Sequence, residues 1–132
     1  MKMVLTYVLA LVVFLIIDMI WLRGIARTTY EAELGSLIKS SPNLIAALAF
    51  YFLYTAGLMY FAIIPALETK SITQALLMGA GLGLVAYGTY DLTNLAVING
   101  FTTKIAIIDL AWGTFVSGIT SAIVVGVMSR FA

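Results

Sequence analysis

The segment YGTYDLTNLAVINGFTTKIAIIDLAWG, residues 87–113, is the most informative part of the sequence. Both ends of this stretch are apolar enough to lie in lipid, and Asn99-Gly100 between them is a turn dipeptide. The stretch therefore predicts the end of one membrane-spanning helix, a tight turn and the start of the next helix. It also carries Asp91 and Asp109, and each carboxylate costs on the order of 2.5–3.5 kcal/mol at the centre of a membrane helix. We expect groups this costly to have a function.

The composition of the whole chain agrees with a membrane protein. Hydrophobic residues make up 63% and charged residues 10%, against about 45–50% and 25% in soluble domains. Helices are expected, because a bilayer leaves no backbone group unpaired. We predict an all-α integral membrane four-helix bundle, formed by one domain at 1–132. Four apolar segments are each about long enough to cross the bilayer, namely residues 3–22, 43–64, 74–98 and 104–128.

The missing residue types exclude several kinds of chemistry. The chain has no cysteine and no histidine, which removes disulfides, thiolate nucleophiles, Cys/His zinc sites and haem ligation by histidine. A net charge of +1 without a basic run gives no reason to expect nucleic acid as a partner. We expect no cofactor and no metal.

Residues suited to begin or end helices flank the apolar segments. Serine, threonine and asparagine accept hydrogen bonds from the first free N–H groups of a helix, and proline disfavours its continuation. The expected boundary residues are Ser40, Ser41, Pro42 and Asn43 before the second span, Pro65 at its end, Ser71 or Thr73 before the third span, and Thr102 or Thr103 before the fourth.

The long connection at residues 23–41 has apolar side chains near helical spacing, including Leu37 and Ile38. Arg27 and Glu31 lie four residues apart on the opposite side. This pattern predicts a short helix in the membrane interface. A solvated linker with a few apolar residues is the alternative.

Topology places three carboxylates near one face of the membrane. The first and third spans run in the same direction, and the fourth starts where the third ends. Asp18 lies about five residues, or ~7.5 Å, from the end of its helix. Asp91 lies in the last turns of the third span, and Asp109 lies in the second turn of the fourth. All three acids are therefore expected at a similar depth, where they could form an acid–base cluster.

Helical spacing adds candidate ligand-binding residues. Tyr87, Asp91 and Asn94 share one face of the third span, with Tyr90 beside them. Polar residues on one face of a membrane helix indicate a site or an interhelical contact. Arg23 is the cation nearest to Asp18 in sequence, and could neutralise a carboxylate or simply extend to the interface.

Two segments of the chain are similar to each other in sequence. LIIDMIW at residues 15–21 and AIIDLAW at residues 106–112 each place a tryptophan three residues after an aspartate. Trp21 and Trp112 could therefore contact a ligand beside the acids. The alternative is that both belong to the aromatic belt at the membrane interface.

Carboxylates that meet in a low-dielectric site cannot all ionise cheaply, so one of them should carry a proton beside a charged neighbour. A protonated donor next to a charged acceptor suits acid–base work on a lipid-like molecule, or the binding of a cation or polar head group. A proton-coupled transporter would use the same property.

The chain resembles a family of small bacterial membrane proteins, domain of unknown function 2177. WLRG at residues 21–24, YGTYDLTNLA at 87–96 and DLAWGT at 109–114 carry the resemblance. It covers essentially the whole chain and implies a four-span protein of the bacterial cytoplasmic membrane. It implies no activity, so the roles of the matching residues rest on the physical argument alone.

Three functions remain open. The first is a buried acidic pocket that binds, or acts by acid–base chemistry on, a membrane lipid or small lipophilic ligand; whether this is an enzyme stays undecided. The second is a small dimeric proton- or cation-coupled transporter. The third is a non-catalytic accessory subunit. Rows of small residues, Gly79 with Gly83 and Gly113 with Ser117 and Ser121, would allow close helix packing or a homodimer.

Overall fold

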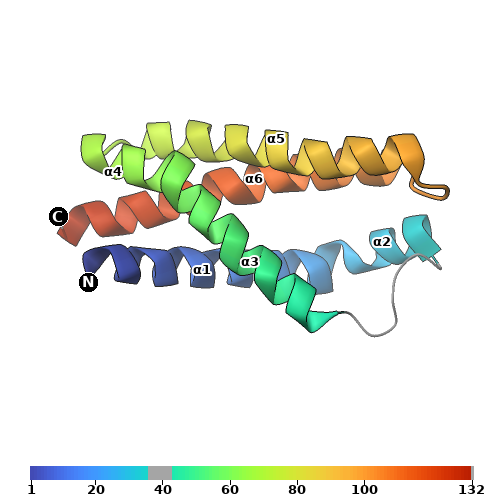
Figure 1. Ribbon diagram of the computed structural model, residues 1–132, viewed down its shortest axis with the longest axis horizontal. Helices are drawn as coiled ribbons and strands as arrows, with labels where there is room; N and C mark the ends of the chain where they lie inside the picture. The colour runs from blue at the N-terminus through green and yellow to red at the C-terminus, as the bar shows by residue number, and fades with distance from the viewer. Residues whose placement is uncertain (36–42, 132) are drawn as a thin grey trace.

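The structure is a computed structural model that describes residues 1–35 and 43–131. Within these ranges it contains helices and no strand, and four helical rods are long and apolar enough to span a membrane (Figure 1). These rods are Lys2–Gly24, Leu44–Thr69, Ile72–Val97 and Thr103–Phe131. The predicted all-α four-helix bundle is confirmed, and the chain is an integral, multi-pass membrane protein.

Two of the rods contain π-helical segments. The first rod consists of α1 (Lys2–Ile20) and a π-helical segment (Trp21–Ile25), and α2 (Arg27–Leu34) follows it. In the second rod, a π-helical segment (Met59–Ile63) separates α3 (Leu44–Leu58) from α4 (Ile64–Thr69). The last two rods are α5 (Ile72–Val97) and α6 (Thr103–Met128), and α6 ends in a short 3₁₀ turn, Ser129–Phe131.

Side-chain caps begin three of these helices where the sequence predicts them. Asn43 accepts a hydrogen bond from the Ala46 N–H group, Ser71 accepts one from Gln74, and Thr102 accepts one from Ile105. Each cap satisfies an N–H group that the helix itself leaves free. The predicted boundary residues Ser40, Ser41 and Pro42 lie outside the described residues.

Pro65 does not end the second rod, contrary to the prediction. It occupies the first turn of α4, where a missing N–H group costs little. The preceding π-helical segment changes the hydrogen-bond register just before the proline. The rod ends five residues later than predicted, at Thr69, because Lys70 adopts a left-handed conformation with φ 52°.

The helices α5 and α6 form a closely packed hairpin that supports the rest of the fold. Gly79 and Gly83 of α5 are buried against Ser117 and Ser121 of α6. Small residues let two helix backbones approach closely where water supplies no driving force. The predicted small-residue rows are thus used inside one chain, and a homodimer through them stays a prediction.

The second rod crosses the bundle obliquely (Figure 1). Its first part, α3, packs on α1, whereas the π-helical segment and α4 pack on α5 and α6. The start of α3 therefore stands away from the α5–α6 hairpin. Side chains from several helices line the space left at this end.

The predicted short helix of the first loop is present as α2. Arg27 and Glu31 form the expected pair at 3.1 Å. The helix packs beside the start of α6, where Thr102 donates a hydrogen bond of 2.6 Å to Glu33. Leu37 and Ile38, which the prediction also used, lie outside the described residues, and its position in the membrane interface stays a prediction.

Replacing Gly79 with alanine should destabilise the hairpin. The added Cβ would lie 2.6 Å from the Ser117 carbonyl oxygen and 2.5 Å from the Ser121 hydroxyl, which is closer than atoms pack without strain. Overpacking of this kind costs about 1–3 kcal/mol. Gly81→Ala is the matched control two residues away, where the new Cβ meets nothing within 4 Å. Unfolding in detergent should show a lower melting temperature for Gly79→Ala only; equal loss in both variants would contradict the packing.

Candidate functional site

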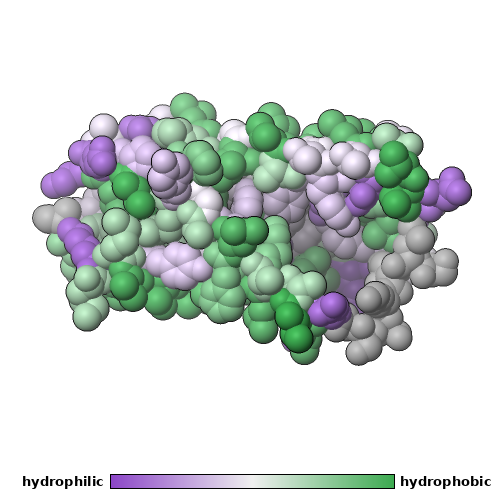
Figure 2. Space-filling view, in the orientation of Figure 1, coloured by the Kyte–Doolittle hydropathy of each residue, from purple (hydrophilic) through white to green (hydrophobic). Residues whose placement is uncertain are grey.

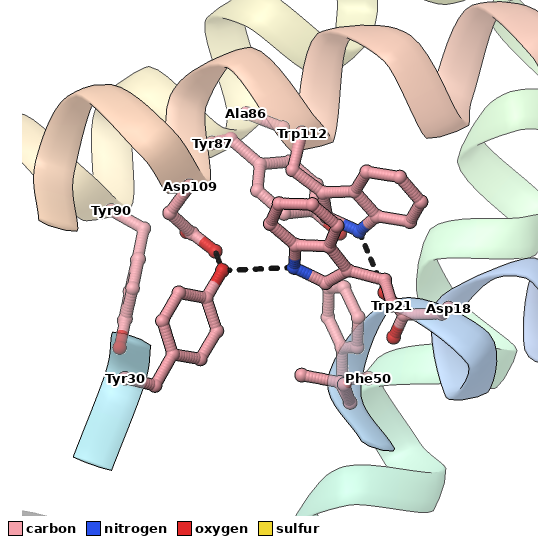
Figure 3. A pocket seen from close by; sticks show the side chains of 10 residues that line it. Asp18, Trp21, Tyr30, Phe50, Ala86, Tyr87, Tyr90, Asp109 and Trp112 are labelled. Carbon is pink, nitrogen blue, oxygen red and sulfur yellow. Dashed lines mark hydrogen bonds between the residues drawn. The ribbon is translucent and has the colours of Figure 1, made fainter. Parts of the chain in front are cut away.

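A cavity of about 390 Å³ lies where α3 stands away from the hairpin. Figure 2 shows this face of the molecule hollowed between α3 and the α5–α6 pair, with weakly hydrophilic residues along the hollow. The volume is within the range of ligand sites, about 300–1,000 Å³. Six helical elements contribute its lining: Asp18, Trp21, Leu22, Tyr30, Phe50, Ala86, Tyr87, Tyr90, Asp109 and Trp112 (Figure 3).

Asp18 is held by donors from two other helices. The carboxylate is buried, with 6% of the residue exposed. The Tyr51 hydroxyl of α3 donates to one oxygen at 2.5 Å, and the Trp112 indole N–H of α6 donates to the other at 2.9 Å. A buried charge is tolerated only when such partners are present. The hydrogen bonds of Asp18 therefore join α1, α3 and α6 at the cavity.

Asp109 is held from α2, outside the spans. The Tyr30 hydroxyl donates to it at 2.8 Å, and the same hydroxyl oxygen accepts a 3.1 Å hydrogen bond from the Trp21 indole (Figure 3). Burial, and next the neighbouring Asp109 carboxylate, raise the pKa of the Tyr30 phenol above its ordinary value. Tyr30 therefore remains a protonated donor at neutral pH.

The two tryptophans stack face to face at the centre of the site. Their ring centroids are 4.4 Å apart and the planes differ by 5°. Each tryptophan supports the aspartate of the other segment. The Trp112 indole donates to Asp18, and the Trp21 indole donates to Tyr30, which in turn donates to Asp109. The two similar segments, residues 15–21 and 106–112, thus lie against each other on antiparallel helices. Both rings line the cavity, which favours the prediction of ligand contact over a belt role alone.

Asp91 lies beside the cavity without lining it. The residue is fully buried, and neither carboxyl oxygen has a hydrogen-bond donor among the described residues. Asp109 lies close enough to Asp91 for the two carboxyl groups to influence each other's charge, but no hydrogen bond joins them. The three predicted acids therefore meet at one end of the bundle, but they occupy different positions in the site.

The remaining predicted residues divide into two groups. Tyr87 and Tyr90 line the cavity. Asn94 does not line it, although it lies one turn beyond Tyr90 on α5. Arg23 is exposed and forms no salt bridge with a described residue, so of the two predicted roles the neutralisation of a carboxylate is not seen. Tyrosine and tryptophan donors take that place.

Sequence reasoning did not place Tyr30 or Phe50 in the site. Tyr30 lies in the long connection, and its partner Asp109 is 79 positions away. Phe50 carries no polar signal. Tyr51 lies in an apolar segment without an acid of its own, and its hydroxyl reaches Asp18. Several tyrosines on a helix facing a predicted acid are the only signal that could have identified such a donor.

Removing the Tyr51 hydroxyl should destabilise the fold measurably. Tyr51→Phe would leave one buried oxygen of Asp18 without its donor, and hydrogen bonds to charged groups contribute about 1.5–3 kcal/mol. Tyr60→Phe is the matched control on the same rod, because Tyr60 is 71% exposed and forms no hydrogen bond with a described residue. Unfolding free energy in detergent measures both; equal values for the two variants would show that the Asp18–Tyr51 bond contributes nothing.

A family model described as a predicted membrane protein, domain of unknown function 2177 (DUF2177), matches residues 3–126. No curated protein and no solved structure shows significant similarity to the chain. The match spans all four membrane helices and every residue that lines the cavity. The chain therefore belongs to the DUF2177 family of membrane proteins.

Proposed function

We propose that this protein binds a small lipophilic ligand with a polar group in the cavity beneath one membrane face. The observation that carries the proposal is the lining: six aromatic side chains surround two carboxyl groups. Apolar walls with a few fixed polar groups are typical of small-molecule sites. The aromatic walls would hold the apolar body of the ligand, while Asp18 and Asp109 would orient its polar group.

Asp91 and Asp109 give the proposed site a group that can take up or release a proton. The two carboxyl groups lie near each other, and Asp91 is fully buried and does not line the cavity. Mutual repulsion disfavours ionisation of both groups. Acid–base chemistry on the bound ligand would therefore act through Asp109, which lines the cavity, with Asp91 as its proton-sharing partner.

The alternative of a transporter has less support. A continuous route needs polar groups through both halves of the bilayer. The half near the termini contains buried hydroxyls, such as Thr6, Thr55 and Thr120, but no buried acidic or basic residue in the described part of the chain. We favour a binding pocket that opens at one face. We place it in the bacterial cytoplasmic membrane, on the strength of the family resemblance.

Purification should recover the ligand. Protein extracted in a mild neutral detergent is examined by mass spectrometry for small molecules that remain bound. We expect a lipophilic compound with the unaltered protein and its loss in Asp109→Asn. Glu68→Gln is the matched control. This acid is exposed at the end of α4, and α4 lies at the opposite end of the molecule from α2 and the cavity (Figure 1).

Size-exclusion chromatography establishes that each variant is folded. The same compound retained equally by Asp109→Asn and Glu68→Gln would show that it binds elsewhere. A folded protein that carries no small molecule, and takes up none from a lipid extract, would overturn the proposal.

A further inference from the structure

Four hydrogen-bond donors around the cavity are already used within the protein, and the Tyr87 and Tyr90 hydroxyls are the donors of its lining that remain. The Tyr51 hydroxyl and the Trp112 indole donate to Asp18. The Tyr30 hydroxyl donates to Asp109, and the Trp21 indole donates to Tyr30. Both indoles and two of the tyrosine hydroxyls at the site are therefore unavailable to a ligand that needs a donor.

The acceptors, in contrast, are in excess. An ionised carboxylate has about four lone-pair positions on its two oxygens. Asp18 accepts two hydrogen bonds from described residues and Asp109 accepts one. Most of the remaining hydrogen-bonding capacity of the cavity is thus acceptor capacity. A ligand that brings donors of its own would use this capacity best.

The electrostatics of the lining point to a positive charge. None of the lining residues that the structure describes is lysine or arginine, and two are aspartates. Aromatic faces attract cations through the negative potential above the ring, most strongly for tryptophan. Six aromatic rings surround these two acids. An anionic ligand would meet repulsion here, and a neutral one would leave the carboxylates without a counter-charge.

We infer that the ligand is a lipophilic protonated amine, a class that narrows the function proposed above and rests on it. Its ammonium group donates to the free positions of Asp109 and Asp18, and its apolar body lies against the aromatic lining. Charge-assisted N–H to carboxylate bonds are about twice as strong as neutral ones. A primary or secondary amine fits better than a quaternary one, because only N–H groups use the free acceptors.

Tryptophan fluorescence can test this inference directly. The sequence has two tryptophans, and both line the cavity, so the signal comes from the site itself. The protein in neutral detergent is titrated with octylamine, 1-octanol and octyltrimethylammonium, which share one chain and differ in the head group. Octylamine is protonated at pH 7, as a lysine side chain is.

We expect a saturable change with octylamine, at an affinity at least about tenfold higher than for 1-octanol or octyltrimethylammonium; tenfold corresponds to about 1.4 kcal/mol. Asp109→Asn should lower the octylamine affinity about tenfold and leave the 1-octanol affinity unchanged. Glu68→Gln should bind all three probes as the unaltered protein does. Asp18→Asn provides a second acid variant if Asp109→Asn does not fold, and the comparison of head groups needs no variant.

Each other outcome has a definite meaning. Equal affinities for octylamine and 1-octanol would overturn the amine class and leave the lipophilic pocket standing. Equal affinities for octylamine and octyltrimethylammonium would overturn the requirement for N–H donors. No saturable change with any probe would count against the proposed pocket itself.

Discussion

Carboxylates buried inside a membrane helix bundle need hydrogen-bond donors from the protein, and this requirement organises the structure. Water solvates such groups in a soluble protein, but lipid does not, and an unpaired buried charge is too costly to keep. Asp18 meets this need with hydrogen bonds from Tyr51 and Trp112. Asp109 meets it with Tyr30, which Trp21 supports. Because the donors come from other helices, satisfying each acid also fixes the relative positions of α1, α2, α3 and α6.

The small residues of the α5–α6 hairpin and the oblique second rod make room for this arrangement. The hairpin uses glycine and serine to bring two backbones together, and its far end carries Tyr87, Asp109 and Trp112 at the cavity. Since α3 contacts α1 and the hairpin contacts the later part of the same rod, the start of α3 cannot close on the hairpin. Aromatic side chains line the opening. The π-helical segment at Trp21 also belongs to this region, and π-helical turns are frequent at functional sites.

Periodicity and topology were sufficient to predict the spans and the depth of the acids. The apolar segments, the caps at Asn43, Ser71 and Thr102, and the meeting of three aspartates at one end all follow from spacing and from alternating helix direction. The rest depends on tertiary contacts. The sequence predicts a helix end at Pro65, because sequence alone does not distinguish a π-helical turn from ordinary α-helix. Tyr30 joins the site only because α2 packs against α6, a contact between residues far apart in the chain.

The three acids, similar in depth, differ in their surroundings, and this difference is what spacing alone could not show. Asp18 has a donor on each oxygen, which fixes its position. Asp109 has one donor, faces the cavity and keeps free acceptor positions. Asp91 has no donor among the described residues and lies near Asp109. A proton shared by Asp91 and Asp109 would reduce the charge of the empty cavity, and a cation arriving at Asp109 would compensate for the loss of that proton. Under the proposed function, the acid behind the cavity wall would let the negative charge of the site change with its occupant, which a single fixed carboxylate could not do.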